Sequence, residues 1–120
     1  MLRDSLQRWY VRAASKLLAE KTAFWAETIA VRPQRISIRD QKTRWGSASP
    51  RGNVNYNWRI VMAPPETVDY LVAHELCHIK IANHSAVFWQ LVSQFIPDYK
   101  RHRAWLHQHG PLLTRFLGNC

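Results

Sequence analysis

The first part of the chain combines apolar and charged residues with the period of an α-helix. Between residues 2 and 29, apolar side chains recur at steps of three and four with charged residues between them, which predicts one long helix. The helix should end near Val31, because the residue before Pro33 disfavours helical dihedrals. Its apolar positions are Leu6, Trp9, Tyr10, Ala13, Leu17, Phe24, Trp25 and Ile29.

The pattern then changes to an alternation of apolar and polar residues, which is typical of strands. Residues 35–39 predict one half-buried strand, and residues 45–49 and 53–58 predict a hairpin. The turn of this hairpin has Pro50 at its second position and Gly52 at its fourth, as type I turns favour. We therefore expect a small, mainly antiparallel sheet.

A second long helix is predicted after Pro65, which suits the first turn of a helix. Its residues 68–79 are apolar on nearly every side. A helix of this kind has no face for solvent, so it should be buried in the middle of the protein.

The rest of the chain also has helical patterns. One helix is predicted over residues 86–96, where Ser85 can cap its start, and another from residue 97 to about 109, where Gly110-Pro111 should end it. A chain of 120 residues with this order of elements is expected to form one compact α+β domain over residues 1–120.

The predicted buried helix carries the motif His74-Glu75-Leu76-Cys77-His78, written H-E-x-x-H. His74 and His78 are one helical turn apart, so both imidazoles can reach one metal ion. Glu75 projects about 100° from His74, so its carboxylate can reach a water on the metal without binding the metal. Such a site suits hydrolysis, because zinc acidifies the water and a carboxylate takes its proton. We therefore expect Zn²⁺ as the cofactor and Glu75 as the general base.

A zinc site of this type needs a third protein ligand. His84 is the leading candidate, although on an unbroken helix it would lie about 120° away from His78 around the axis. The chain must therefore turn between them, and Asn83 tolerates the backbone conformation that closes a helix. The other possible third ligands are His102, His107 and His109.

The chain also carries a large excess of positive charge. Seventeen Lys and Arg against eight Asp and Glu give a net charge of +9, which favours anionic partners. Residues 32–51 hold six of these cations and only one acid, Asp40. They form either a solvated basic surface or a face for an anionic substrate or nucleic acid, and the candidates for that face are Arg39, Lys42, Arg44 and Arg51.

Two cysteines, Cys77 and Cys120, are too few for a disulfide framework, so a cytoplasmic location is expected. The apolar stretches are shorter than a membrane span, so no membrane partner is expected. The pattern gives no indication of an oligomeric state.

Several blocks of the sequence resemble the YgjP-like zinc metallopeptidase-type family, which is related to the SprT-like and gluzincin-type hydrolases. The resemblance implies a zincin-like core, with zinc on His74, His78 and His84 and with Glu75 as the base. Many relatives have cysteine where this chain has Ala48, so any role of that thiol is missing here. The similar blocks are residues 39–47, 57–59, 62–65, 69–70, 74–78, 83–85, 88–89 and 97–99.

These observations favour a zinc-dependent hydrolase, most simply a metallopeptidase that acts on peptides or proteins. Two alternatives remain open at this point. The activated water could attack a nucleotide phosphate among the basic residues, as in a phosphohydrolase. The chain could instead be a nucleic-acid-associated module with a structural zinc. The candidates for stabilising a developing oxyanion or contacting the substrate are Tyr56, Arg59, Tyr99 and His102.

Overall fold

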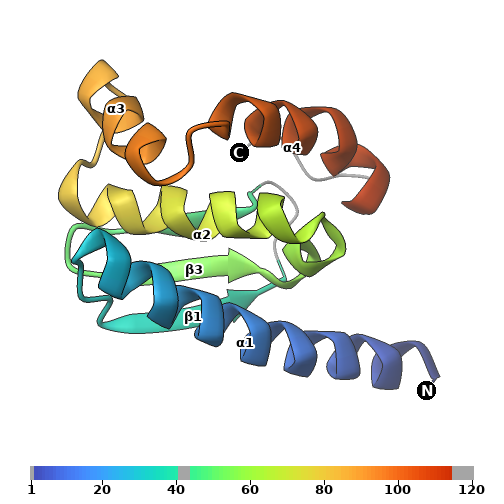
Figure 1. Ribbon diagram of the computed structural model, residues 1–120. Coiled ribbons are helices and arrows are strands. Elements are labelled where there is room, and N and C mark those ends of the chain that lie inside the picture. The colour runs from blue at the N-terminus through green and yellow to red at the C-terminus, as the bar shows by residue number, and fades with distance from the viewer. Residues whose placement is uncertain (1, 41–43, 115–120) are drawn as a thin grey trace.

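Four α-helices, one 3₁₀ helix and three strands make up residues 2–40 and 44–114, the part of the chain that the computed structural model describes (Figure 1). In chain order they are α1 (Leu2–Ile29), β1 (Arg35–Arg39), β2 (Gly46–Ala48), β3 (Asn53–Asn57), the 3₁₀ helix η1 (Trp58–Met62), α2 (Pro65–Lys80), α3 (Ala86–Phe95) and α4 (Tyr99–Thr114).

Helix α2 runs through the middle of the molecule. The sheet and α1 lie on one side of it, and α3 and α4 lie on the other (Figure 1). Eleven of its 16 residues are buried, as its apolar pattern predicts. The core side chains on either side of α2 include Leu18, Trp45, Tyr56 and Phe88, each fully shielded from solvent. The fold is therefore the expected α+β arrangement around a buried central helix.

The sheet is mixed, and this corrects the expectation of a mainly antiparallel sheet. Its strand order is β1-β3-β2, with β3 in the middle. The predicted hairpin joins β2 and β3 in antiparallel register, but β1 pairs with β3 in parallel, from Arg35 opposite Asn53 to Arg39 opposite Asn57. The chain passes from β1 to the far side of the sheet before the hairpin returns β3 into the gap. Alternation within one strand does not specify its neighbour, so the sequence pattern could not predict this order.

Helix α1 has the predicted bounds but buries a different face. Its buried side chains are Ala14, Leu18, Thr22, Ala26 and Ile29, which form one narrow stripe. Three large side chains of the predicted apolar face are instead exposed, with Leu6, Trp9 and Phe24 at 54%, 58% and 61%. The beginning of α1 extends past the other described elements (Figure 1), so none of these elements covers its apolar side chains there.

Three side-chain hydrogen bonds join α1 to α2. Asp69 of α2 accepts hydrogen bonds from Lys21 Nζ at 2.9 Å and from Trp25 Nε1 at 3.0 Å. At the end of α1, Lys80 Nζ donates to the carbonyl oxygen of Ile29 at 2.7 Å. Both helices also run in the same direction (Figure 1), so their ends lie at the same side of the molecule.

The helices after α2 differ from the prediction at one end. Ser85 caps α3 as expected, with its hydroxyl accepting from the Phe88 N–H at 3.3 Å. Helix α4 does not end at Gly110 but continues to Thr114. Gly110 packs against the Trp45 indole, where an added Cβ would lie 3.3 Å from Cζ2, so its small size serves packing rather than helix termination. Among the described residues, no helix has both the length and the apolar character needed to cross a membrane.

Candidate metal centre

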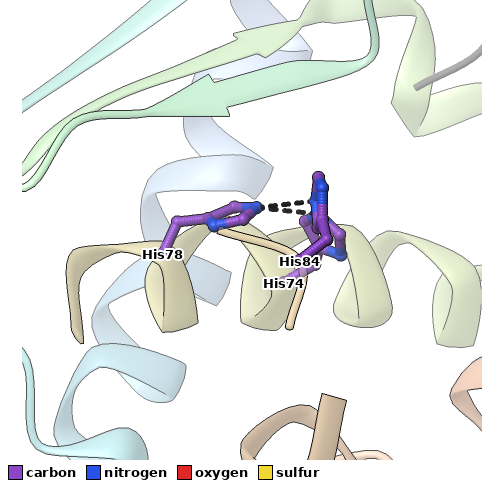
Figure 2. A group of neighbouring side chains, drawn as sticks. All are labelled: His74, His78 and His84. Carbon is purple, nitrogen blue, oxygen red and sulfur yellow. Dashed lines mark hydrogen bonds between the residues drawn. The ribbon is translucent and has the colours of Figure 1, made fainter. Parts of the chain in front are cut away.

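Three histidine side chains converge on one point beside α2. His74 and His78 come from successive turns of α2, and His84 comes from the segment between α2 and α3, which folds back over the helix. Figure 2 shows the three rings pointing toward one another. Their Nε2 atoms lie 3.2 Å apart for His74 and His78, 3.0 Å for His78 and His84, and 3.4 Å for His74 and His84. The turn expected before His84 therefore brings all three imidazoles together.

Contacts at the other ring nitrogen orient two of these rings, and one of these contacts sets the tautomer of His78. His78 Nδ1 lies 3.1 Å from the carbonyl oxygen of Ile81. A carbonyl oxygen only accepts, so Nδ1 carries the hydrogen and Nε2 of the neutral ring has a lone pair. His74 Nδ1 lies 3.2 Å from the Tyr70 hydroxyl. Outer contacts of this kind orient histidines that bind metals through the opposite nitrogen.

The three histidines are also held in the neutral form. Burial, together with the nearby charges of His78, His84 and Arg103, lowers the pKa of His74 to about 3. Burial likewise lowers the pKa values of His78 and His84 below the ordinary imidazole value. Neutral imidazole is the form that binds a metal.

This donor set fits a tetrahedral metal ion. Nitrogen ligands at 2.0–2.1 Å from such an ion lie about 3.3 Å from one another. The observed Nε2 separations of 3.0–3.4 Å match that spacing. Two of the ligands are buried and His84 is exposed, so the cluster has one side that substrate can approach. With each Nε2 deprotonated, the three nitrogens would present their lone pairs to one cation.

Glu75 is buried in the core, where α2 contacts β2. Its side chain is 2% exposed, and burial raises its pKa to about 8, although the Arg44 charge acts in the opposite direction. Its carboxylate packs against β2 at Gly46, where an added Cβ would lie 3.1 Å from Glu75 Oε2 and 2.9 Å from the carbonyl oxygen of Asn55. Only glycine leaves space for this approach of the carboxylate to the strand.

A cleft of about 740 Å³ opens beside the cluster, between α2, α3 and α4. Tyr70, His74 and His84 form its wall on the side of the metal centre. Trp89 of α3 and a series of α4 side chains form the rest, including Lys100, Arg103 and His107. The metal centre therefore faces an open space large enough for a segment of substrate.

Tyr56 and Arg59, the two candidates for oxyanion stabilisation that precede α2, do not line the cleft. The Tyr56 hydroxyl is buried in the core and shares a hydrogen bond with Thr22 at 2.9 Å. Arg59 forms an ion pair with Asp40 and stacks over the Trp58 ring at 4.6 Å. Neither side chain lines the cleft.

Tyr99 and His102, the two candidates for oxyanion stabilisation on α4, each stack on a ring that lines the cleft. Tyr99 stacks on Trp89, with ring centroids 5.1 Å apart. His102 is buried and stacks on Tyr70, while its ring nitrogens lie 3.0 Å from Thr67 Oγ1 and 3.2 Å from Asp98. Both are therefore one ring away from the space that substrate would occupy.

The other two histidines weighed as third ligands also lie outside the cluster. His109 Nδ1 bonds to the Trp105 carbonyl oxygen at 3.1 Å, and its ring stacks on Trp105. His107 lines the cleft but is not part of the group of converging nitrogens. The described residues thus bring only His84 to His74 and His78.

The structure describes three of the four residues of the predicted anionic face. Arg39 is opposite the last residue of β3, where it donates to Asn55 Oδ1 at 3.3 Å, whereas Arg51 is in the turn before β3, at the other end of the strand. Arg44 is the member whose charge acts on Glu75. Lys42 lies outside the described residues. Arg39 and Arg51 therefore lie at opposite ends of β3, and a common face of all four cations stays a prediction.

Sequence reasoning did not assign several residues that line the cleft, among them Tyr70, Trp89, Lys100 and Arg103. Tyr70 could have been found, because it precedes His74 by one helical turn and so shares its face. The others depend on how α3 and α4 fold back over α2, which no local pattern records.

Comparisons with known proteins agree with this geometry. The family model described as YgjP-like, metallopeptidase domain, matches residues 1–109. The chain belongs to the YgjP-like family. Membership of this family makes the chain a metallopeptidase-type hydrolase, and the three histidines are its candidate ligands for a metal ion. Among proteins of curated function, none matches the sequence significantly.

Two solved structures share the fold of this YgjP-like chain. One is the metallopeptidase zymogen abylysin from Pyrococcus abyssi, with 20% identity and a TM-score of 0.68 over 76% of this chain and 92% of that chain. The other is the metallopeptidase zymogen jannalysin from Methanocaldococcus jannaschii, with 19% identity and a TM-score of 0.59 over 70% of this chain and 90% of that chain. At these identities the likeness concerns the fold.

Proposed function

We propose that this chain is a zinc-dependent peptidase that holds the metal through His74, His78 and His84. The observation that carries the proposal is the convergence of three neutral Nε2 atoms within 3.4 Å of one another at the edge of an open cleft. Bound zinc supplies a Lewis acid that polarises the peptide carbonyl and acidifies the attacking water.

Glu75 is the general base in this proposal. Its carboxylate takes a proton from the attacking water and later gives that proton to the leaving amine. The buried setting of Glu75 supports this role, because desolvation raises its pKa and lets the carboxylate hold a proton between the two steps. Gly46 supports it too, since the close packing of β2 limits where the carboxylate can lie.

The unpaired edge of β2 is the proposed place for the substrate backbone. Within the described residues β2 pairs only with β3, so its second edge is available for an extended peptide. For the oxyanion we keep Tyr99 and His102 as candidates, because each stacks on a ring that lines the cleft. Tyr56 and Arg59 would have to leave their present partners, Thr22 and Asp40, to take this role.

The test is metal-dependent cleavage of peptides. Protein stripped by a chelator is reloaded with Zn²⁺, Mn²⁺ or Mg²⁺ and incubated with casein and with a mixture of peptides from a digested proteome, whose new ends are read by mass spectrometry. We expect cleavage with zinc, and no cleavage without metal or in a Glu75→Gln variant that keeps its zinc. Cleavage by that variant at the wild-type rate would contradict the proposed base.

A second candidate function is nucleotide phosphohydrolysis. Lys100 and Arg103 in the cleft favour it, because basic side chains stabilise a phosphoryl group in transfer. Release of phosphate from nucleoside triphosphates, measured on the same zinc-loaded samples, separates the two functions. Phosphate release without any peptide cleavage would replace the peptidase proposal with this one.

A further inference from the structure

The cleft beside the metal centre is lined by cations and, among the described residues, by no carboxylate. Two of its lining residues, Lys100 and Arg103, carry a positive charge, and none of the lining residues is an acid. Asp98, the acidic residue at the start of α4, is already bound to Arg101 and lies near His102. Within the described residues, neither Lys100 nor Arg103 forms an ion pair.

Arg103 is held in place by an aromatic ring instead of by an acid. Its guanidinium lies over the Trp89 ring, 4.7 Å from the centroid. The same ring stacks on His84, with centroids 5.6 Å apart and planes 18° from parallel, and on Tyr99 behind it. Trp89 therefore links the cation to one of the metal-ligand candidates, and the charge of Arg103 is felt by both His74 and His84.

We propose that Arg103, with Lys100 beside it, forms a subsite for a carboxylate of the peptide substrate close to the scissile bond. The carboxylate is either an acidic side chain or the free C-terminus of the peptide. This inference rests on the proposed peptidase function and deepens it by naming the class of substrate.

The chemistry of the arginine side chain supports a carboxylate as the ligand. A guanidinium offers parallel N–H donors that match the two oxygens of a carboxylate, and stacking leaves these edge donors available. Because Trp89 already orders the guanidinium, little side-chain entropy is lost when the substrate binds. A neutral substrate residue at the same place would leave the positive charges of Lys100 and Arg103 without a counter-charge.

The experiment compares matched peptides on zinc-loaded protein. A sequence cleaved in the digested-proteome mixture is synthesised with Glu or Gln at each position near the scissile bond, and with a free or an amidated C-terminus. We expect the wild type to prefer one carboxylate form by about 10- to 100-fold in kcat/KM, as for a charged hydrogen bond. The Glu–Gln pairs report a side-chain carboxylate, and the free–amidated pair reports a C-terminal one.

Three variants assign that preference to Arg103. Arg103→Gln should reduce it to near unity, and Arg103→Lys should restore part of it by keeping the charge without the planar fork. Arg101→Gln is the matched control, because Arg101 carries the same charge on the same helix but is absent from the cleft lining. Its preference should equal that of the wild type, and zinc content should be equal in all variants.

The possible results separate the subsite from the peptidase function. Peptide cleavage with the same carboxylate preference in the wild type and Arg103→Gln would overturn the subsite and leave the peptidase intact. An equal loss of preference in Arg101→Gln and Arg103→Gln would also overturn it, by showing an effect of net charge. Phosphate release without peptide cleavage would overturn both proposals.

Discussion

Helices α1 and α2 lie against each other but use their residues in opposite ways. In α2, solvent is excluded from nearly every side between Thr67 and His78. In α1, only a narrow stripe is buried, and even Trp9 and Phe24 face solvent. A polar group without a partner in a setting like that of α2 costs several kcal/mol, whereas on α1 it costs almost nothing. The comparison shows that burial of these polar side chains in α2 costs free energy, so each of them needs a function or a partner to explain it. They are Tyr70, His74, Glu75 and His78.

The largest expected effect follows from Glu75→Gln, which keeps the shape of α2 and removes the base. Turnover should fall by about 100- to 10,000-fold, while zinc content stays the same. The measurement is kcat on a cleaved peptide together with elemental analysis of zinc. Loss of zinc from the variant would show that Glu75 acts on the metal rather than on the water.

The next effect concerns packing, and it compares the same substitution in the two helices. Leu71→Ala in α2 removes a fully buried side chain, so the free energy of unfolding should fall by about 2–5 kcal/mol. Urea denaturation of the metal-free protein, followed by tryptophan fluorescence, measures this change. A loss below 1 kcal/mol, on the order of a surface substitution, would mean that α2 is not the packed centre of the fold.

His84→Ala tests the ligand that lies outside both helices. Zinc affinity should fall by more than about 100-fold, because loss of an outer hydrogen-bond partner alone costs 10- to 100-fold. Competition with a chromogenic chelator gives the affinity, and elemental analysis of the wild type should give one zinc per chain. His107→Ala is the matched control, since His107 lines the cleft without joining the cluster.

Tyr70→Phe sharpens the comparison within α2. It removes only the hydroxyl that contacts His74 Nδ1, so zinc affinity should fall by about 10- to 100-fold while the fold is kept. The same chelator competition measures it. An unchanged affinity, with an unchanged structure by circular dichroism, would show that the ring of His74 is oriented by its packing alone.

The smallest effect is expected in α1. Leu6→Ala changes a side chain that is 54% exposed, so the free energy of unfolding should change by no more than about 0.5 kcal/mol. It is measured beside Leu71→Ala under the same conditions. A loss comparable to that of Leu71→Ala would mean that another surface covers this part of α1 in solution.

The sequence predicted the parts of this molecule that depend on local spacing. The positions of His74, Glu75 and His78 follow from the helical period, and the approach of His84 follows from the need for a turn after α2. The bounds of α1 and the hairpin of β2 and β3 were also predicted correctly. Each of these features is encoded within a few neighbouring residues.

The remaining features depend on contacts between distant segments. The parallel pairing of β1 with β3 was missed because a strand pattern records which side chains face the core and not which strand is adjacent. Leu6 and Trp9 fit the apolar period of α1, but both are exposed among the described residues. Arg103 became a site residue only because α4 folds back over α2.

The contact between Lys80 and Ile29 has an electrostatic consequence for the metal. Because α1 and α2 run in the same direction, the carbonyl ends of both helices lie at one side of the molecule, where each carries a partial negative charge of about half an elementary unit. The ammonium group of Lys80 neutralises the end of α1 directly. His78, in the last turn of α2, remains within the negative field of its own helix. The backbone thus contributes attraction for a divalent cation at a centre whose three converging side chains are all uncharged.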